Sequence, residues 1–265
     1  MCLIAYLPKD KVMSKEEVEK AWRINDDGAG IAFFENGEWK IIKAVMKSEE
    51  IIKLIERYKN TSKVVHFRAA SAGGVHPELT HPFETHRYIL FHNGTWIHWN
   101  TFCSLLKLFP IFQKYWKKYN EEMNYNPDLI SDTKLLAFLL YLVEEGKCVK
   151  KEVEEIIKEA GKIVIIDKKK NKVMFYGNFE NDSGRKFSNS SYKGYFGYTL
   201  SYGSGIYSGY GNYGNYNYYY GREMEKGDDF DLSESEIYGC FNKTRKENEN
   251  TNSHENKRRF EYDAF

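Results

Sequence analysis

Cys2 is the residue of this sequence whose chemistry is easiest to name. Aminopeptidases remove Met1 when the second residue is small, and the chain would then begin with a thiol and a free α-amino group on one residue. An α-amino group has a pKa near ~7.7–8.0, so part of it is neutral at pH 7 and accepts a proton. A thiol that loses its proton is a strong nucleophile. Cys2 can therefore supply both nucleophile and base; the alternative is a small apolar residue that opens a buried strand.

Two predicted strands end in residues that could bind a carboxylate or stabilise an oxyanion. Residues 64–71 read Val-Val-His-Phe-Arg-Ala-Ala-Ser, and the guanidinium group of Arg68 can hold a carboxylate through two parallel hydrogen bonds. Residues 89–95 read Ile-Leu-Phe-His-Asn-Gly-Thr. There, the side-chain amide of Asn93 beside the N–H of Gly94 can stabilise the oxyanion of a tetrahedral intermediate. A surface salt bridge at the first strand and a hairpin turn at the second are the structural alternatives.

The elements that must position these residues follow an α+β order. Strands cluster towards both ends of the first ~190 residues with helices between them, rather than in strict alternation. Apolar patterns and an Asn-Gly turn predict strands at residues 2–7, 31–34, 39–45, 63–69, 88–92, 162–166 and 173–176. Apolar spacings of three and four residues predict helices after the capping box Ser14–Glu17, at residues 51–58, across 105–119 with a break at Pro110, and at residues 135–143 and 149–160.

The composition changes sharply near residue 192. Tyrosine and glycine dominate residues 192–220, and residues 221–265 are rich in charge with almost no aliphatic periodicity. Such a segment cannot bury enough apolar surface to offset the entropy cost of ordering it. We therefore expect a folded domain at residues 1–192 and a disordered low-complexity tail at residues 193–265. The alternative is an aromatic segment for self-association, a partner or single-stranded nucleic acid, because tyrosine rings stack on each other and on bases.

Composition also excludes several classes of protein. Lys and Arg total 39 against 38 Asp and Glu, and a net charge of +1 gives no field that would collect nucleic acid or anionic lipid. No apolar run reaches the ~18–20 residues of a membrane-spanning helix, and the first residues do not resemble a secretion signal. The four cysteines lie far apart, which disfavours a disulfide scaffold and a structural zinc site. These features predict a reduced, cytoplasmic protein.

Histidines are concentrated in one part of the sequence. Six of the seven lie between residues 66 and 98. His76, His81 and His86 are separated by intervals of five residues. This spacing matches neither one face of a helix nor a metalloprotease motif. We expect structural roles, and roles in support of the site, for these histidines rather than a catalytic metal.

Four segments, in this order, resemble the class II glutamine amidotransferase domain, a glutaminase with an N-terminal nucleophile. They are Cys2, residues 25–32 (Asn-Asp-Asp-Gly-Ala-Gly-Ile-Ala), the strand that ends at Arg68, and Asn93-Gly94. Further segments fall where the family has comparable residues: Thr80-His81-Pro82-Phe83, Ser131-Asp132-Thr133, and Phe187-Ser188-Asn189-Ser190-Ser191, which resembles the last strand of small stand-alone members. Many members read Trp-Ala-Thr-His after the arginine, where this chain reads Ala69-Ala70-Ser71-Ala72.

The resemblance implies a fold and a catalytic centre. The fold would be a four-layer αββα sandwich of the N-terminal nucleophile hydrolase type over roughly residues 2–192. Cys2 would be the nucleophile, its α-amino group the base, and Asn93 with Gly94 the oxyanion hole. No metal or organic cofactor is needed for this chemistry.

The resemblance also implies contacts with the substrate, glutamine or a glutamine-like amide. Arg68 would bind the α-carboxylate of glutamine and Asp132 its α-ammonium group. Ser71 would add a hydrogen bond to the substrate carboxylate.

The activity predicted from this resemblance is hydrolysis of the glutamine side-chain amide by the N-terminal cysteine. Residues 193–265 cannot form a synthase domain, so the released ammonia would serve a synthase on a separate chain. Two alternatives stay open: a stand-alone hydrolase of γ-glutamyl or related amides, and an inactive interaction protein that keeps this fold and uses the tail. A membrane partner is not expected, and a nucleic-acid partner is expected only through the tail.

Overall fold

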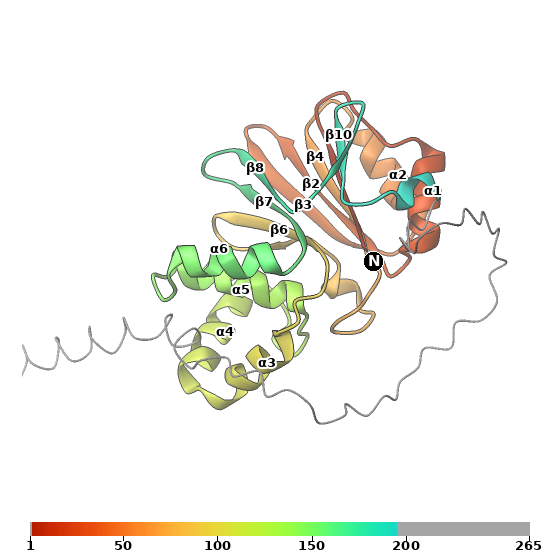
Figure 1. Cartoon of the computed structure of the whole chain (residues 1–265). Coiled ribbons are helices and arrows are strands. Elements are labelled where there is room, and N and C mark those ends of the chain that lie inside the picture. The colour runs from red at the N-terminus through yellow and green to blue at the C-terminus, as the bar shows by residue number, and fades with distance from the viewer. Residues whose placement is uncertain (1, 195–265) are drawn as a thin grey trace, which may run out of the picture.

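The structure is a computed structural model that describes residues 2–194. Its strands form two antiparallel sheets (Figure 1). The six-stranded sheet has the order β3-β2-β4-β1-β10-β9 and consists of β1 (Leu3–Leu7), β2 (Ala29–Glu35), β3 (Glu38–Val45), β4 (Lys63–Phe67), β9 (Glu180–Asp182) and β10 (Arg185–Phe187). The four-stranded sheet has the order β5-β6-β7-β8 and consists of β5 (Phe83–Glu84), β6 (Tyr88–Asn93), β7 (Lys162–Asp167) and β8 (Lys172–Tyr176).

Six α-helices and two short 3-10 helices complete the described part of the chain. They are α1 (Lys15–Ile24), α2 (Ser48–Arg57), α3 (Trp99–Leu108), α4 (Pro110–Glu122), α5 (Asp132–Glu144), α6 (Lys150–Glu159), η1 (Pro77–Leu79) and η2 (Ser191–Lys193). Mixed helices and strands with antiparallel sheets confirm the α+β prediction.

The two sheets face each other, and helices cover their outer faces (Figure 1). Side chains from both sheets, including Ile4, Val64, Phe91 and Val164, share one apolar cluster between them. A second cluster joins the other face of the six-stranded sheet to α1 and α2, and a third joins the four-stranded sheet to α3–α6. Because each sheet buries both of its faces, the strand ends near the site are held rigidly by apolar packing.

Local sequence signals explain the first elements. The turn between β2 and β3 places Asn36 and Gly37 at φ values of 54° and 87°, a conformation that these residue types adopt readily and that matches the twist of a hairpin. Ser14 and Glu17 form the predicted capping box, in which each side chain accepts the main-chain N–H of the other residue. Both predictions are confirmed.

The predicted break of the helical segment at Pro110 is confirmed, and the expected strand at residues 187–191 was wrong in detail. The helical segment is interrupted at Phe109, and Pro110 is the first residue of α4, because proline fits the first helical turn, where its missing N–H is not needed. Of residues 187–191 only Phe187 lies in a strand, because β10 ends there and the following residues turn into η2. The sequence also gave no signal for β5 and β9, which have two and three residues and are too short for a periodic pattern.

The described residues extend just past the predicted domain boundary at residue 192. Tyr192 is 1% exposed and stacks on Phe187 with ring centroids 3.8 Å apart, so the first tyrosine of the Tyr/Gly-rich tract packs in the folded part. The predicted tail lies outside the described residues from residue 195 onwards. Within residues 2–194, none of the helices combines the length and the apolar character needed to cross a bilayer.

Candidate active site

The structure brings most of the predicted site residues to one pocket, although they are far apart in the sequence. Cys2 precedes β1 and Arg68 follows β4, and the first residue of β1 pairs with the last residue of β4, so the two site residues are neighbours. Gly94 follows β6, and Asp132 is the first residue of α5. The pocket is lined by Cys2, Arg68, Ala69, Ala70, Ser71, Ala72, His81, His92, Gly94, Ser131, Asp132 and Thr133.

The thiol of Cys2 lies against the main chain of Ala69. Its sulfur is 3.3 Å from the carbonyl oxygen of Ala69 and 3.4 Å from the N–H nitrogen of the same residue. Burial raises the pKa of the Cys2 thiol, and the hydrogen bond with the Ala69 main chain opposes part of that rise. Because a buried thiol retains its proton, a nucleophilic role for Cys2 requires a base close to the sulfur.

Arg68 carries a buried charge in the same pocket. The residue is 3% exposed, and its Nη2 donates to the carbonyl oxygens of Ala72, at 3.3 Å, and Gly74, at 2.7 Å. The Nη1 atom is buried and has no hydrogen-bond partner among the described residues. A guanidinium group with an unused donor and only main-chain carbonyl partners is suited to bind an anion that enters the pocket.

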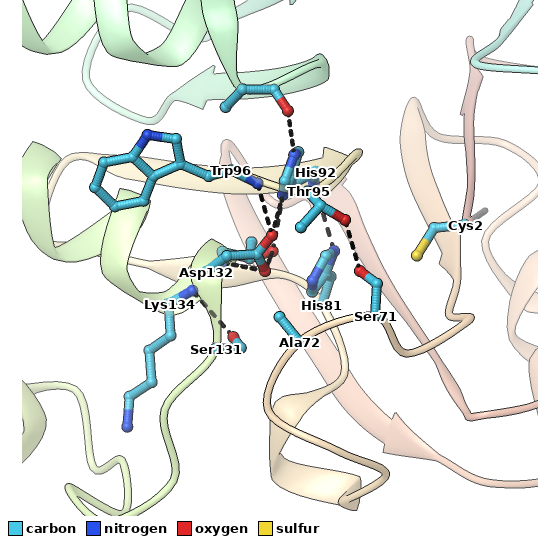
Figure 2. A network of polar contacts seen from close by, with 12 residues as sticks. Cys2, Ser71, Ala72, His81, His92, Thr95, Trp96, Ser131, Asp132 and Lys134 are labelled. Carbon is cyan, nitrogen blue, oxygen red and sulfur yellow. Dashed lines mark hydrogen bonds and ion pairs between the residues drawn. The ribbon is translucent and has the colours of Figure 1, made fainter. Parts of the chain in front are cut away.

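Asp132 lies at the N-terminal end of α5, after the N-cap Ser131. One oxygen of its carboxylate accepts the Trp96 N–H at 3.1 Å, and the other accepts the Thr133 N–H at 2.7 Å. The Nδ1 atom of His92 is 3.6 Å from this carboxylate (Figure 2). The carboxylate is therefore fixed in orientation by main-chain donors, and it still lines the pocket.

Three buried histidines lie beneath and beside the pocket. The Nε2–H of His66 donates to the carbonyl of His92, and the Nε2–H of His92 donates to the carbonyl of Ala160. The rings of His66 and His81 are 3.9 Å apart. Burial lowers the pKa of His66 to about 3 and the pKa values of His81 and His92 below their ordinary value. These imidazoles bind a proton too weakly to serve as the base for a thiol of raised pKa.

Two loops at the pocket are held by defined contacts. The Asp27 carboxylate accepts the N–H of Ala70 at 2.7 Å, which fixes the segment after Arg68. The hydroxyl of Thr95 donates to that of Ser71 at 2.9 Å and joins this segment to the loop after β6 (Figure 2). Ser71 thus lines the pocket, and its hydroxyl is in contact with that of Thr95.

Gly94 is required by close packing. A Cβ atom at this position would lie 2.5 Å from the carbonyl oxygen of Ala160 and 2.8 Å from Nε2 of His92. A side chain would push the loop away from the end of α6, so the main-chain N–H of Gly94 can keep its present place only with glycine at this position.

The side chain of Asn93 bonds to Ser188 and is not part of the pocket lining. It is 5% exposed, its Nδ2 is 2.8 Å from the hydroxyl oxygen of Ser188, and its Oδ1 is buried without a partner among the described residues. Of the six predicted site residues, Asn93 is the one whose side chain does not line the pocket.

Residues 188–191 contact the site in a way that was not predicted from the sequence. Asn189 donates from Nδ2 to the carbonyl oxygen of Cys2 at 2.7 Å, and its Oδ1 accepts the N–H and the hydroxyl of Ser191. The signal was present as a polar run after a strand, but a contact across 187 residues leaves no local pattern.

The described residues contain no group of three or more His, Cys, Asp or Glu side chains arranged to hold a metal ion. Among the described residues, Cys2 and Cys103 are in no disulfide.

No protein-family model matches the chain, and no curated protein matches it in sequence. Among solved structures, one match is glutamine phosphoribosylpyrophosphate (PRPP) amidotransferase from B. subtilis, in complex with ADP and GMP. The match has a TM-score of 0.46 and 15% sequence identity, and it covers 72% of this chain. It covers 42% of the other chain, so this chain corresponds to less than half the length of that protein. The likeness is a distant one in fold.

Proposed function

We propose that this chain is a class II glutamine amidotransferase, an amidohydrolase that uses an N-terminal cysteine to release ammonia from glutamine. One observation carries the proposal: a thiol at residue 2, a buried guanidinium group with an unused donor, and a fixed carboxylate line the same pocket. In this proposal the layers of helices and sheets form the αββα sandwich of the N-terminal nucleophile hydrolases, in a domain at residues 1–192.

The pocket suits a zwitterionic amino acid. Arg68 binds the α-carboxylate, because its unused Nη1 donor and buried charge favour an anion. Asp132 receives the α-ammonium group on the opposite side, and its main-chain hydrogen bonds keep the carboxylate in place. Ser71 contributes a hydroxyl at the same wall. With both charged groups of glutamine bound, the side-chain amide extends towards Cys2.

The base in this mechanism is the α-amino group of Cys2 after removal of Met1. The thiol needs a base since burial raises its pKa, and the nearby histidines have lowered pKa values. The thiol proton passes to the amine as sulfur attacks the amide carbon. The N–H of Gly94 and the amide of Asn93 stabilise the oxyanion, a contribution of roughly 10²–10³ in rate for each donor.

The remaining steps balance without a cofactor. When the tetrahedral intermediate collapses, the C–N bond breaks, and the nitrogen leaves as ammonia after it takes the proton held by the α-amine. Water then attacks the thioester, the C–S bond breaks, and glutamate leaves with the thiol restored. A synthase on a separate chain would consume the ammonia.

A second candidate is a stand-alone hydrolase of γ-glutamyl amides. Ala69, Ala70 and Ala72 line the pocket with small side chains, which would crowd a substituent on the amide nitrogen less than large side chains would. Turnover of a γ-glutamyl anilide at a higher kcat/KM than glutamine would favour this candidate. The reverse preference supports the glutaminase.

The test is glutaminase activity of purified protein that lacks Met1. Cys2→Ala should abolish release of ammonia, and Cys103→Ala, which removes another free thiol, should leave it unchanged. Activity that persists in Cys2→Ala overturns the proposed nucleophile. A wild-type protein that releases ammonia neither from glutamine nor from γ-glutamyl amides would instead be an interaction protein without turnover.

A further inference from the structure

Ser188 connects the two sheets at the site. It follows β10 and is completely buried. Its hydroxyl oxygen lies 2.8 Å from the Ile4 main-chain nitrogen in β1 and 2.8 Å from Nδ2 of Asn93 at the end of β6. Its own N–H donates to the carbonyl of Ile4 at 2.9 Å, and the Lys162 ammonium group donates to its carbonyl. The position of the Ser188 hydroxyl is therefore set by the main chain around it.

The hydrogen bonds of this hydroxyl can be counted. A serine hydroxyl has one hydrogen to donate and two lone pairs that accept. The N–H of Ile4 occupies one lone pair, because an N–H can only donate. With Nδ2 of Asn93 on the second lone pair, the hydroxyl hydrogen lacks an acceptor among the described contacts, and Oδ1 of Asn93 is buried without a partner.

The opposite orientation of the Asn93 amide gives a partner to Oδ1 and to the hydroxyl hydrogen, and it takes the Ser188 partner away from the NH₂ group. After a half-turn about the last side-chain bond, Oδ1 accepts the hydroxyl hydrogen of Ser188, and the NH₂ group takes the place that Oδ1 now has. An unsatisfied buried polar group costs about 1–3 kcal/mol. This orientation therefore exchanges two unsatisfied groups for an NH₂ group without a protein partner, a donor that an oxyanion would satisfy. Because a hydroxyl both donates and accepts, Ser188 can hold either orientation.

We propose that Ser188 is a positioning residue that controls which way the Asn93 amide faces, and thereby whether its NH₂ group is free to stabilise the oxyanion. The inference rests on the proposed function, in which Asn93 supplies an oxyanion donor. Ser188 is buried behind Asn93, so it acts through that amide and not on the substrate. A side chain at residue 188 without a hydroxyl would leave the amide without its partner.

The test is a double-mutant cycle with Ser188→Ala and Asn93→Ala, assayed for glutaminase kcat and KM. Ser188→Ala should lower kcat by up to roughly 10²-fold with KM nearly unchanged, since the loss is confined to oxyanion stabilisation. In the Asn93→Ala background the same substitution should have no further effect on kcat. Ser188→Thr keeps the hydroxyl and should recover most of kcat. Ser190→Ala is the matched control, because Ser190 makes no side-chain cap bond in η2, and its kcat should equal that of the wild type.

The outcomes separate this inference from the proposed function. A wild-type kcat in Ser188→Ala, or a loss that multiplies with that of Asn93→Ala, overturns the role of Ser188 while the glutaminase stands. A wild-type protein without glutaminase turnover overturns both. If Ser188→Ala does not fold, Ser188→Cys is assayed in its place, because a thiol is a weak donor and acceptor of similar shape. Wild-type kcat in that variant also contradicts the inference.

Discussion

The side-chain amide of Asn189 donates a 2.7 Å hydrogen bond to the main-chain carbonyl of Cys2. The other end of this amide accepts two hydrogen bonds from Ser191, so Asn189 is fixed before it contacts Cys2. The segment after β10 thus restrains the residue that carries the proposed nucleophile and base.

Removal of this restraint should reduce catalysis. Asn189→Asp keeps an acceptor for Ser191 but cannot donate to the Cys2 carbonyl. Cys2 therefore loses the hydrogen bond that restrains its main chain. We expect kcat of the glutaminase to fall by roughly 10-fold or more, since small displacements of reacting groups are costly. Steady-state kinetics checks this, with Asn181→Asp at an exposed position of β9 as the control. An unchanged kcat in Asn189→Asp would show that the anchor has no part in catalysis.

Arg68 should act in substrate binding. Arg68→Ala removes the buried guanidinium group, and we expect KM for glutamine to rise roughly 10- to 100-fold, the value of a charge-assisted hydrogen bond. Arg68→Lys keeps the charge without the planar fork and should give an intermediate KM. Arg57→Ala, an exposed arginine at the end of α2, is the control. A loss confined to kcat would contradict the role of Arg68 as a carboxylate ligand.

Lys43 should make stability depend on pH. Its ammonium nitrogen is buried without a hydrogen-bond partner among the described residues, and lies 4.0 Å from the centre of the Phe83 ring and 4.9 Å from that of Tyr125. Burial lowers the pKa of Lys43 to about 7; Lys134 and Arg68 lower it further, and Glu78 and Glu84 oppose the shift. Between pH 7 and about 10.4 the unfolded chain binds a proton that the folded chain does not, so this group favours folding more as pH rises.

The matching variant is Lys43→Met. It should raise the free energy of unfolding most at or below pH 7, by a few kcal/mol, and the gain should shrink towards pH 10. Urea unfolding at pH 6.5 and pH 9.5 measures the difference. Lys40→Met, on the same strand but in an exposed ion pair with Glu35, should change stability little at either pH. A gain from Lys43→Met that is equal at both pH values would contradict the shifted pKa.

Gly94→Ala should disturb both stability and activity. Its Cβ would lie 2.5 Å from the Ala160 carbonyl oxygen, which belongs to the main chain and cannot move independently. We expect a loss of about 1–3 kcal/mol in the free energy of unfolding and a larger relative loss in kcat, because the N–H of residue 94 moves from its place. Urea unfolding and glutaminase kinetics on one preparation check the two effects. Wild-type kcat with lowered stability would remove Gly94 from the oxyanion hole.

The sequence predicted the elements with strong local signals. Ser14 with Glu17 and Asn36-Gly37 are patterns whose physics lies within a few residues, and α1 and the β2–β3 hairpin follow them. The short strands β5 and β9 pair with the strands that directly follow them, β6 and β10, but with two and three residues they are too short to show a periodic pattern.

The candidate site likewise contains residues that the sequence predicted and contacts that it did not. Cys2, Arg68 and Gly94 could be singled out because each stands at the end of a predicted strand, and Asp132 because of the family resemblance. The structure places the four in one pocket. The orientation of Asn93 against Ser188 could not be predicted, since it depends on where β10 ends relative to β1 and β6. Their roles in catalysis stay predictions that the experiments above address.

The most direct test of the account is intact-mass and peptide mass spectrometry after treatment with a glutamine-like diazo-ketone. The account predicts a chain that lacks Met1 and carries one adduct on the Cys2 sulfur, formed as N₂ leaves. Excess glutamine should protect the Cys2 thiol from modification, and Arg68→Ala should slow formation of the adduct. Retention of Met1, or modification of Cys103 with Cys2 untouched, would contradict the central claim that Cys2 is an N-terminal nucleophile.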